Sequence, residues 1–228
     1  MSRSSATSSR SWCTATVPAE IRLLYADDAL LVLDKPAGLL SVPGRGEDKQ
    51  DCLSTRVQRH WRDALVVHRL DMATSGLMLM ARGTAAQRSL NHAFAQRQVT
   101  KRYVALLHGC LAPLPGDWGQ VDLPIALDWP NRPRRVVPAE GGKASVTRWR
   151  VQAGADAAHT RVELEPVTGR SHQLRVHMLA IGHPIVGDAL YFDRQPIDAP
   201  RLMLHASQIA LLHPIGKQPM QFRCAPDF

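Results

Sequence analysis

A single acidic residue in a turn is the strongest sign of chemistry in this sequence. His68-Arg69-Leu70-Asp71 is followed by the turn residues Thr74-Ser75-Gly76 and then by an apolar run, 77–81. This order places Asp71 in a loop at the edge of a sheet, where a rigid strand can hold a functional group. The residues alone leave two interpretations open: Asp71 takes part in chemistry, or it caps the turn with Arg69 as its ion-pair partner.

Other kinds of catalytic or cofactor site lack their usual spacing. The ten histidines include His172, His177 and His183, but neither these nor the four cysteines follow the spacing of a common metal site. The sequence has no Gly-x-Ser-x-Gly elbow for a nucleophilic serine, and no Gly-rich loop that ends in the Lys-Ser or Lys-Thr of a phosphate-binding loop. We therefore expect no bound metal and no cofactor.

Positive charge indicates the class of partner. The chain carries 28 Lys and Arg against 20 Asp and Glu, a formal net charge of +8. The basic residues gather in two groups, which favours a polyanion, most commonly nucleic acid, although a solvated basic surface is the alternative. The groups are Arg132, Arg134, Arg135, Lys143, Arg148 and Arg150, and Arg88, Arg97, Lys101 and Arg102.

Length and composition limit the fold. With 228 residues, 45% of them hydrophobic, the chain can bury a core. No apolar run approaches the ~20 residues that span a bilayer, so we expect no membrane protein. The four separated cysteines form no disulfide framework, which favours the cytoplasm. The serine-rich, acid-free stretch 1–19 predicts a disordered tail, and residues 20–228 predict one domain.

The apolar pattern predicts a domain of the α+β class. Helices should begin at the caps Asp51, Thr84 and Ser171, and the last two should end near Gln98 and Ile181. Short apolar or alternating runs predict strands at 30–33, 77–81, 103–107, 146–151, 161–164, 202–204 and 209–212.

A series of motifs resembles the RluA family of pseudouridine synthases. The resemblance extends over residues 21–228, and the order of the motifs makes it specific. It implies a single catalytic domain with a mixed, mostly antiparallel β-sheet flanked by helices and loops, and without the S4-type domain of larger members. The motifs are Asp34-Lys35-Pro36-Ala37-Gly38, His68-Arg69-Leu70-Asp71, Lys101-Arg102-Tyr103, Thr168-Gly169-Arg170-Ser171-His172-Gln173-Leu174-Arg175, Gly182-His183-Pro184-Ile185, Gly187-Asp188 and Arg201-Leu202-Met203-Leu204-His205-Ala206.

The resemblance also implies a reaction, the isomerisation of uridine to pseudouridine in RNA. No electrons are exchanged, so no cofactor is required. Asp71 would be the nucleophile, and Tyr103 would lie against the target base and serve as a general base. Because a carboxylate between apolar walls tends to take up a proton, a guanidinium must keep it ionised, and Arg170 matches the family arginine in that role.

RNA recognition follows from the same resemblance. A stacked uridine must be flipped out of its helix to reach the pocket, and Arg69 would enter the space that it leaves. For Lys35 and Arg175, a phosphate contact and an internal salt bridge are both open. The implied partner is a short stem-loop of 23S rRNA or of a tRNA anticodon arm, bound by a monomer. The expected RNA-binding residues are His68, Arg69, Lys35, Arg132, Arg134, Arg135 and Arg175.

Two other functions compete with the isomerase. A non-catalytic RNA-binding module would keep the basic surface but would not need Asp71, Tyr103 and Arg170 together. A hydrolase that used Asp71 would need a second carboxylate or magnesium ligands nearby, and the next acidic residue is Asp117. Both comparisons favour the isomerase.

Overall fold

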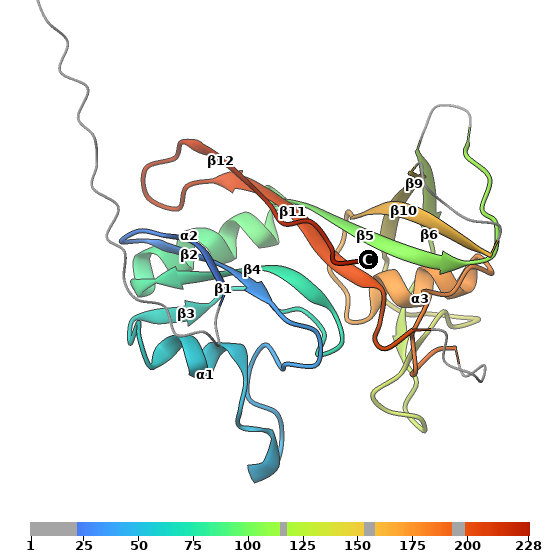
Figure 1. Ribbon diagram of the computed structural model, residues 1–228, viewed down its shortest axis with the longest axis horizontal. Coiled ribbons are helices and arrows are strands. Elements are labelled where there is room, and N and C mark those ends of the chain that lie inside the picture. Colours follow the sequence, from blue (N-terminus) through green and yellow to red (C-terminus); the bar gives the residue numbers. More distant parts are fainter. Residues whose placement is uncertain (1–21, 115–117, 153–157, 193–198) are drawn as a thin grey trace, which may run out of the picture.

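The fold is built on a long β-sheet that continues through the middle of the molecule (Figure 1). The computed structural model describes residues 22–114, 118–152, 158–192 and 199–228, so the predicted tail 1–19 lies outside the described residues. The helices are η1 (Glu47–Lys49), α1 (Leu53–Gln58), α2 (Gly83–Ala95) and α3 (Gln173–Ala180). The strands are β1 (Arg22–Ala26), β2 (Leu30–Lys35), β3 (Ala64–Val66), β4 (Ser75–Arg82), β5 (Thr100–His108), β6 (Gly119–Asp122), β7 (Ala126–Leu127), β8 (Arg135–Val136), β9 (Val146–Val151), β10 (His159–Pro166), β11 (Leu204–Leu212) and β12 (Pro219–Arg223).

The order of the strands confirms the predicted mixed, mostly antiparallel sheet. The described residues form a ten-stranded sheet in the order β1-β2-β4-β11-β5-β10-β9-β6, with β3 beside β4 and β12 beside β11. Its pairings are antiparallel except for β4 with β11, which is parallel. β7 and β8 form a separate hairpin. The long strands β5 and β11 cross the middle of the molecule and join its two ends (Figure 1).

Two hydrophobic cores stabilise the two ends of the sheet. We call β1–β4 with α1 and α2 the first half, and β6, β9 and β10 with α3 the second half. In the first half, the apolar runs of β2 and β4 are buried on both faces, which explains why they are continuous rather than alternating. In the second half, Val162 and Leu164 of β10 pack with Met178 of α3 and with Leu107 of the neighbouring strand β5. Each half is therefore a rigid support for the loops at its edge.

The starts of the helices differ from the sequence prediction. Cys52, not Asp51, caps α1, because the Asp51 carboxylate is bound by Arg56 at 2.8 and 2.6 Å. α2 begins at Gly83, after Arg82, and ends at Ala95, earlier than predicted. His172, not Ser171, precedes α3. His172 has a left-handed backbone with φ 58°, a conformation that is uncommon for a residue other than glycine and that occurs most often where a site constrains the chain.

Gly76 allows β4 of the first half to pair closely with the central strand β11. It lies opposite Ala206 in the parallel pairing of β4 with β11, and its φ is +105°. A Cβ atom at this position would overlap the carbonyl oxygen of Ala206 and would lie 2.6 Å from its nitrogen. Because these are backbone atoms, they cannot move without breaking the pairing. The sequence Thr74-Ser75-Gly76 therefore serves both the turn after Asp71 and the closure of the sheet.

We predict that Gly76→Ala destabilises the fold by about 3 kcal/mol or more, the sum of backbone strain and overpacking. Gly83→Ala is the matched control, because Gly83 also has a positive φ, +75°, but has open space around its Cβ position. It should cost only the backbone strain of about 1–2 kcal/mol. Urea unfolding measures the free energy of unfolding of both variants. Equal destabilisation by the two substitutions would show that the close approach of Gly76 to Ala206 does not add to the backbone strain.

Candidate active site

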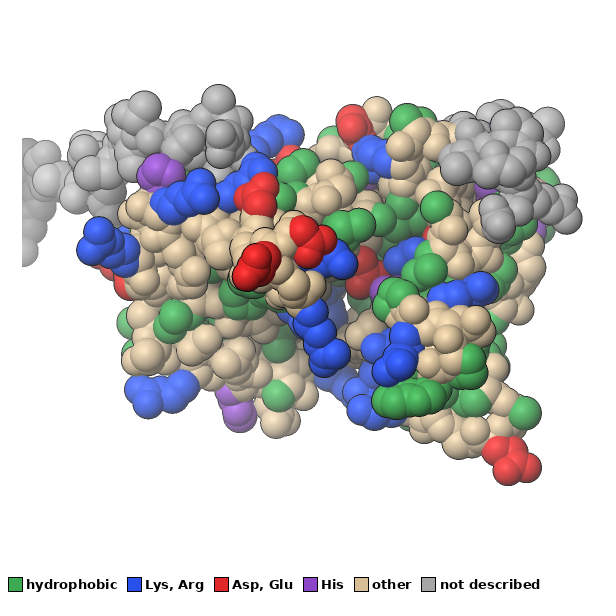
Figure 2. Space-filling model, turned by 90° about the horizontal axis from the view of Figure 1, so that it is seen from below, with side chains coloured by type: hydrophobic (Ala, Val, Ile, Leu, Met, Phe, Trp, Pro, Cys, Tyr) green, Lys and Arg blue, Asp and Glu red, His purple; other side chains and the backbone are tan. Residues whose placement is uncertain are grey.

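A groove with a volume of about 1300 Å³ lies where the two halves meet. This exceeds the roughly 300–1,000 Å³ of pockets for small molecules and suits a larger substrate. Figure 2 shows Lys and Arg side chains on both sides of a hollow in this face of the molecule. Three segments supply much of the wall, and each contains a motif found in the sequence: residues 67–74, residues 99–101 with Tyr103, and residues 165–175.

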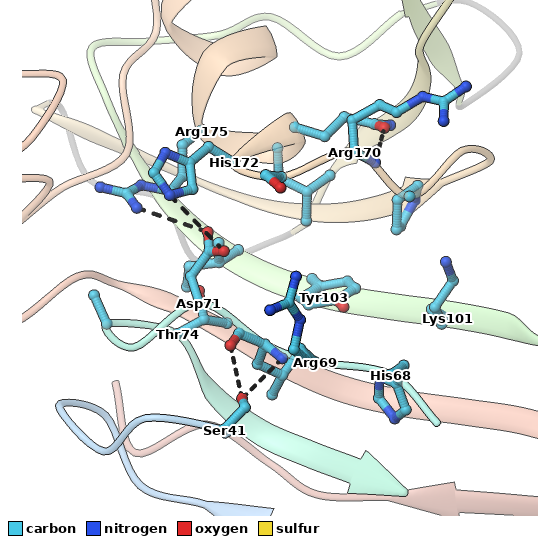
Figure 3. Close-up of a pocket in the computed structure, with 18 of the residues that line it drawn as sticks. Ser41, His68, Arg69, Asp71, Thr74, Lys101, Tyr103, Arg170, His172 and Arg175 are labelled. Carbon is cyan, nitrogen blue, oxygen red and sulfur yellow. Dashed lines mark hydrogen bonds and ion pairs between the residues drawn. The ribbon is translucent and has the colours of Figure 1, made fainter. Parts of the chain in front are cut away.

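Two buried side chains fix the loop that carries Asp71. The hydroxyl of Ser41 donates to the Leu70 carbonyl at 2.7 Å and accepts from the Leu70 N–H at 3.0 Å (Figure 3). On the other side of Asp71, the Met72 carbonyl accepts hydrogen bonds from the ammonium group of Lys35 at 3.1 Å and from the Gly38 N–H at 2.9 Å. Asp71 is thus held between two anchored neighbours, with its side chain partly exposed to the groove.

The predicted RNA contact of Lys35 is wrong, because this side chain is fully buried. Its ammonium group donates to three carbonyls, those of Pro36 at 2.9 Å, Leu39 at 2.8 Å and Met72 at 3.1 Å. Burial lowers the pKa of Lys35 to about 8, while the negative charges of Asp71 and Asp34 oppose the shift. Lys35 is therefore protonated at neutral pH and acts as an internal support of the Asp71 loop.

The guanidinium that faces Asp71 belongs to Arg175 rather than to Arg170, as Figure 3 shows. Arg175 lies 3.7 Å from the Asp71 carboxylate and forms a bidentate pair with the buried Asp188, at 2.7 and 2.6 Å. Burial alone would lower the pKa of Arg175, but the hydrogen bonds and charge of Asp188 raise it above the ordinary arginine value. Arg175 therefore remains a fixed positive charge beside Asp71, which replaces the predicted RNA contact with an internal role.

Arg170 is exposed and points away from Asp71 (Figure 3). Its Nε donates to the Ala144 carbonyl at 3.3 Å, and its backbone N–H donates to Gln173 at 3.0 Å. The predicted pairing of Arg170 with Asp71 is thus not found. Arg170 still lines the groove, where its free end can meet a substrate.

His172 is a second neighbour of Asp71 that the sequence analysis did not assign. Its Nε2 lies 4.0 Å from the Asp71 carboxylate, and its Nδ1 lies 2.6 Å from the Tyr191 hydroxyl. That hydroxyl also accepts the backbone N–H of Arg135 at 2.8 Å, which leaves its proton for Nδ1 of His172. Burial lowers the pKa of His172, so the ring is neutral at pH 7 and presents its Nε2–H towards Asp71.

Tyr103 of β5 and His68 both line the groove. Burial, with the nearby charge of Asp71, raises the pKa of Tyr103 above its usual value, so its hydroxyl keeps the proton at neutral pH. His68 accepts the backbone N–H of Leu79 at 2.8 Å and stacks on Phe94 with ring centroids 4.7 Å apart. Burial and then the charge of Lys101 lower the pKa of His68 to about 3. This neutral ring is held against β4 and also lines the groove, so a contact of His68 with RNA stays a prediction.

The remaining predicted RNA-binding arginines lie on or near the wall of the groove. Arg69 is exposed and points into it (Figure 3). Arg135 also lines it. Arg132 stacks over the Trp129 ring at 4.3 Å, and Arg134 lies 5.6 Å from the centroid of Tyr191. These four arginines belong to two separate loops, one from each side of the groove.

Comparison with known proteins agrees with this arrangement. The family described as RNA pseudouridylate synthase matches residues 29–180. The chain is 49% identical over 207 residues to the dual-specificity RNA pseudouridine synthase RluA of Escherichia coli K12, covering 90% of this chain and 93% of that protein. The identity to RluA of Yersinia pestis is 48%, covering 90% and 99%.

The chain belongs to the RNA pseudouridylate synthase family. It is therefore an isomerase that converts uridine to pseudouridine in RNA. Among solved structures, human RNA pseudouridylate synthase domain containing 1 is similar with a TM-score of 0.74 at 29% identity, covering 91% of this chain and 83% of that chain. The human domain containing 4 protein has a TM-score of 0.70 at 26% identity, covering 90% and 89%.

One cluster in this pseudouridylate synthase has the donor types of a metal site. Ligand atoms of Asp34, His205 and Cys224 lie within 4.8 Å of one another. The ring of His205 is already used, since its Nε2 donates to the Cys224 carbonyl at 3.1 Å and its Nδ1 accepts from the Ser75 hydroxyl at 2.9 Å. Burial, with Asp34, raises the pKa of the Cys224 thiol to about 11. The arrangement is that of a hydrogen-bonded cluster that joins β2, β4 and β11.

No helix in the described parts of the chain combines the length and apolarity needed to cross a bilayer.

We predict that Lys35→Met lowers the free energy of unfolding by about 2 kcal/mol, because three buried carbonyls lose their donor. The pseudouridine-forming rate should fall at least tenfold, because the Met72 carbonyl is no longer held. Lys49→Met is the matched control, an exposed lysine of η1 that should change neither quantity. Urea unfolding and single-turnover assays check the pair. Two variants with the same unfolding midpoint would contradict the proposed support.

Proposed function

We propose that Asp71 is the nucleophile of the isomerisation and that Arg175 provides a fixed positive charge beside it. The observation that carries this proposal is the position of Asp71 in the basic groove, 3.7 Å from a guanidinium that Asp188 holds in place. A carboxylate that is fixed, charged and open to the groove can attack a nucleotide.

The reaction needs only groups that the groove provides. Asp71 adds to the nucleotide, the bond between N1 and C1′ breaks, the base turns, and C5 joins C1′. The proton leaves C5 and N1 ends with a proton, so that product and substrate have the same atoms. The raised pKa of Tyr103 disfavours a phenolate, which is the form that would accept a proton from the base. We therefore propose that Tyr103 packs against the target base and does not act as the general base. When the bond between Asp71 and the nucleotide breaks, the free carboxylate can accept the proton that leaves C5.

Entry of the uridine requires base flipping in this proposal. The groove is open to solvent, but a stacked base cannot reach Asp71 without leaving its helix, which costs a few kcal/mol. Arg69 extends into the groove and can occupy the vacated space, where a planar guanidinium both stacks and donates hydrogen bonds. Arg132, Arg134, Arg135 and Arg170 would hold the backbone.

We propose that the substrates are short stem-loops of 23S rRNA, tRNA or both. Support comes from the relatives, which are described as dual-specificity enzymes and which the chain covers over almost their whole length. Mapping pseudouridine in the RNA of a deletion strain, and of the same strain with the gene restored, identifies the positions. We further propose that the enzyme acts in the cytoplasm as a monomer and without a cofactor.

Asp71→Asn should abolish pseudouridine formation, because the amide keeps the size and polarity of the side chain but is no nucleophile. Affinity for RNA should change less than threefold, since the basic groove is intact. Tritium release from RNA that contains 5-tritiated uridine measures the rate, and filter binding measures affinity. A variant that still released tritium at a rate close to that of the wild type would exclude Asp71 as the catalytic group.

Arg69→Ala should slow single turnover about tenfold more on a stable hairpin than on an open loop of the same sequence. The reason is that only the hairpin requires unstacking of the target base. Arg45→Ala is the control, an exposed arginine that does not line the groove and whose loss should affect both RNAs equally. If Arg69→Ala also slowed both RNAs equally, the flipping role would be wrong.

A further inference from the structure

Trp129 is exposed to an unusual degree for its residue type. Its exposed fraction is 65%, whereas the large apolar ring of tryptophan is usually mostly buried. It lies in the turn of the β7–β8 hairpin, within the segment Asp128–Arg134. Nothing in the reaction described above uses this ring.

The turn that carries Trp129 is internally braced. The Asp128 N–H donates to the Arg134 carbonyl at 3.1 Å, and the Arg134 N–H donates to the Asn131 carbonyl at 3.0 Å. The Asp128 carboxylate accepts the amide of Asn131 at 3.1 and 3.0 Å. These bonds satisfy the acid of the turn internally, and the turn exposes Trp129 and Arg132 to solvent.

One face of the Trp129 ring is already occupied by a cation. The guanidinium of Arg132 lies 4.3 Å from the ring centroid, a cation–π contact that holds the ring in one orientation. The high exposure of Trp129 leaves ring surface free for a ligand. A flat aromatic surface of this kind, backed by a positive charge, suits another flat ring that is attached to a negatively charged chain.

The hairpin is attached to the wall of the groove. Pro133 and Arg135, which follow the turn, line the groove itself. The Arg135 N–H is bound by the Tyr191 hydroxyl, which also contacts His172 beside Asp71. Trp129 is therefore carried by a hairpin whose following residues form part of the groove wall.

We propose that Trp129 and Arg132 form a stacking platform for an unpaired nucleobase of the substrate RNA, other than the target uridine. This inference rests on the proposed function in that it takes RNA as the occupant of the groove. A base within a duplex cannot offer its face to the ring, so the platform selects RNA with an unpaired nucleotide at a set distance from the target. The arginines around the ring favour RNA over an apolar protein surface.

A thermodynamic cycle tests the platform. The probe is a tRNA anticodon stem-loop with uridine at the first loop position, and its unpaired positions are made abasic one at a time. Affinity is measured by fluorescence anisotropy at one fixed salt concentration, in the Asp71→Asn background so that no turnover occurs. Trp129→Ala should weaken binding of the intact RNA about tenfold, and Trp129→Phe should recover most of that loss.

The coupling distinguishes stacking from a general loss of surface. With RNA that is abasic at the contacted position, Trp129→Ala should cause no further loss of affinity. With RNA that is abasic at any other position, the loss of affinity from the missing base and the loss from Trp129→Ala should multiply. Leu212→Ala is the control, because Leu212 is also an exposed apolar side chain but lies at the end of β11 away from the groove. Unchanged affinity in Trp129→Ala, or losses that multiply at every position, would overturn the proposal.

The same RNA separates this proposal from the proposed function. The enzyme with Asp71 intact is assayed for pseudouridine at the first loop position. If no pseudouridine forms while the cycle shows coupling, then this RNA is no substrate but the platform is supported. If pseudouridine forms and no coupling is found, the enzyme acts on this RNA without the platform.

Discussion

The site depends on the short parallel pairing of β4 with β11. Ser75 and Gly76 pair with His205 and Ala206, and this contact fixes the first half of the sheet against the second. Asp71 lies in the turn that leads into β4, whereas its partner guanidinium comes from α3 in the second half. A shift between the halves would separate carboxylate from guanidinium, which is why a glycine with room only for hydrogen stands at the pairing.

Around that pairing, buried charges act as supports rather than as ligands for substrate. Lys35 is enclosed by three carbonyls beneath the Asp71 loop, and Asp188 holds Arg175 against Asp71. Lys35 is hydrogen-bonded to carbonyls and Arg175 is paired with Asp188, as the burial of a charge requires. Charges that meet the RNA in our proposal, such as Arg69 and Arg132, lie on the exposed wall. This separation of buried supporting charges from exposed RNA-binding charges explains how one groove can be both rigid at the reacting group and adaptable towards the RNA backbone.

The sequence predicted the sheet well because the runs of β2 and β4 are apolar throughout, and it located the Asp71 loop through its turn residues. It predicted Arg170 beside Asp71, whereas the structure places Arg175 there, because the two arginines share one motif and only the turn before α3 decides which of them faces Asp71. The side chain of Gln173 binds the backbone of Arg170 and directs that residue outward. The roles of Lys35 and Ser41 depend on contacts with the distant residues Leu70 and Met72, which spacing along the chain does not reveal.

The most direct test of Asp71 acting beside Arg175 is the single-turnover rate of pseudouridine formation at saturating RNA in two variants. In the first, Arg175→Gln is combined with Asp188→Asn, so that no buried carboxylate is left without its partner. In the second, Arg170→Gln changes the exposed arginine of the same motif. We predict a loss of roughly a hundredfold for the first variant and less than about threefold for the second. A severe loss in Arg170→Gln, with the rate of the Arg175 variant preserved, would contradict the arrangement of the site described above.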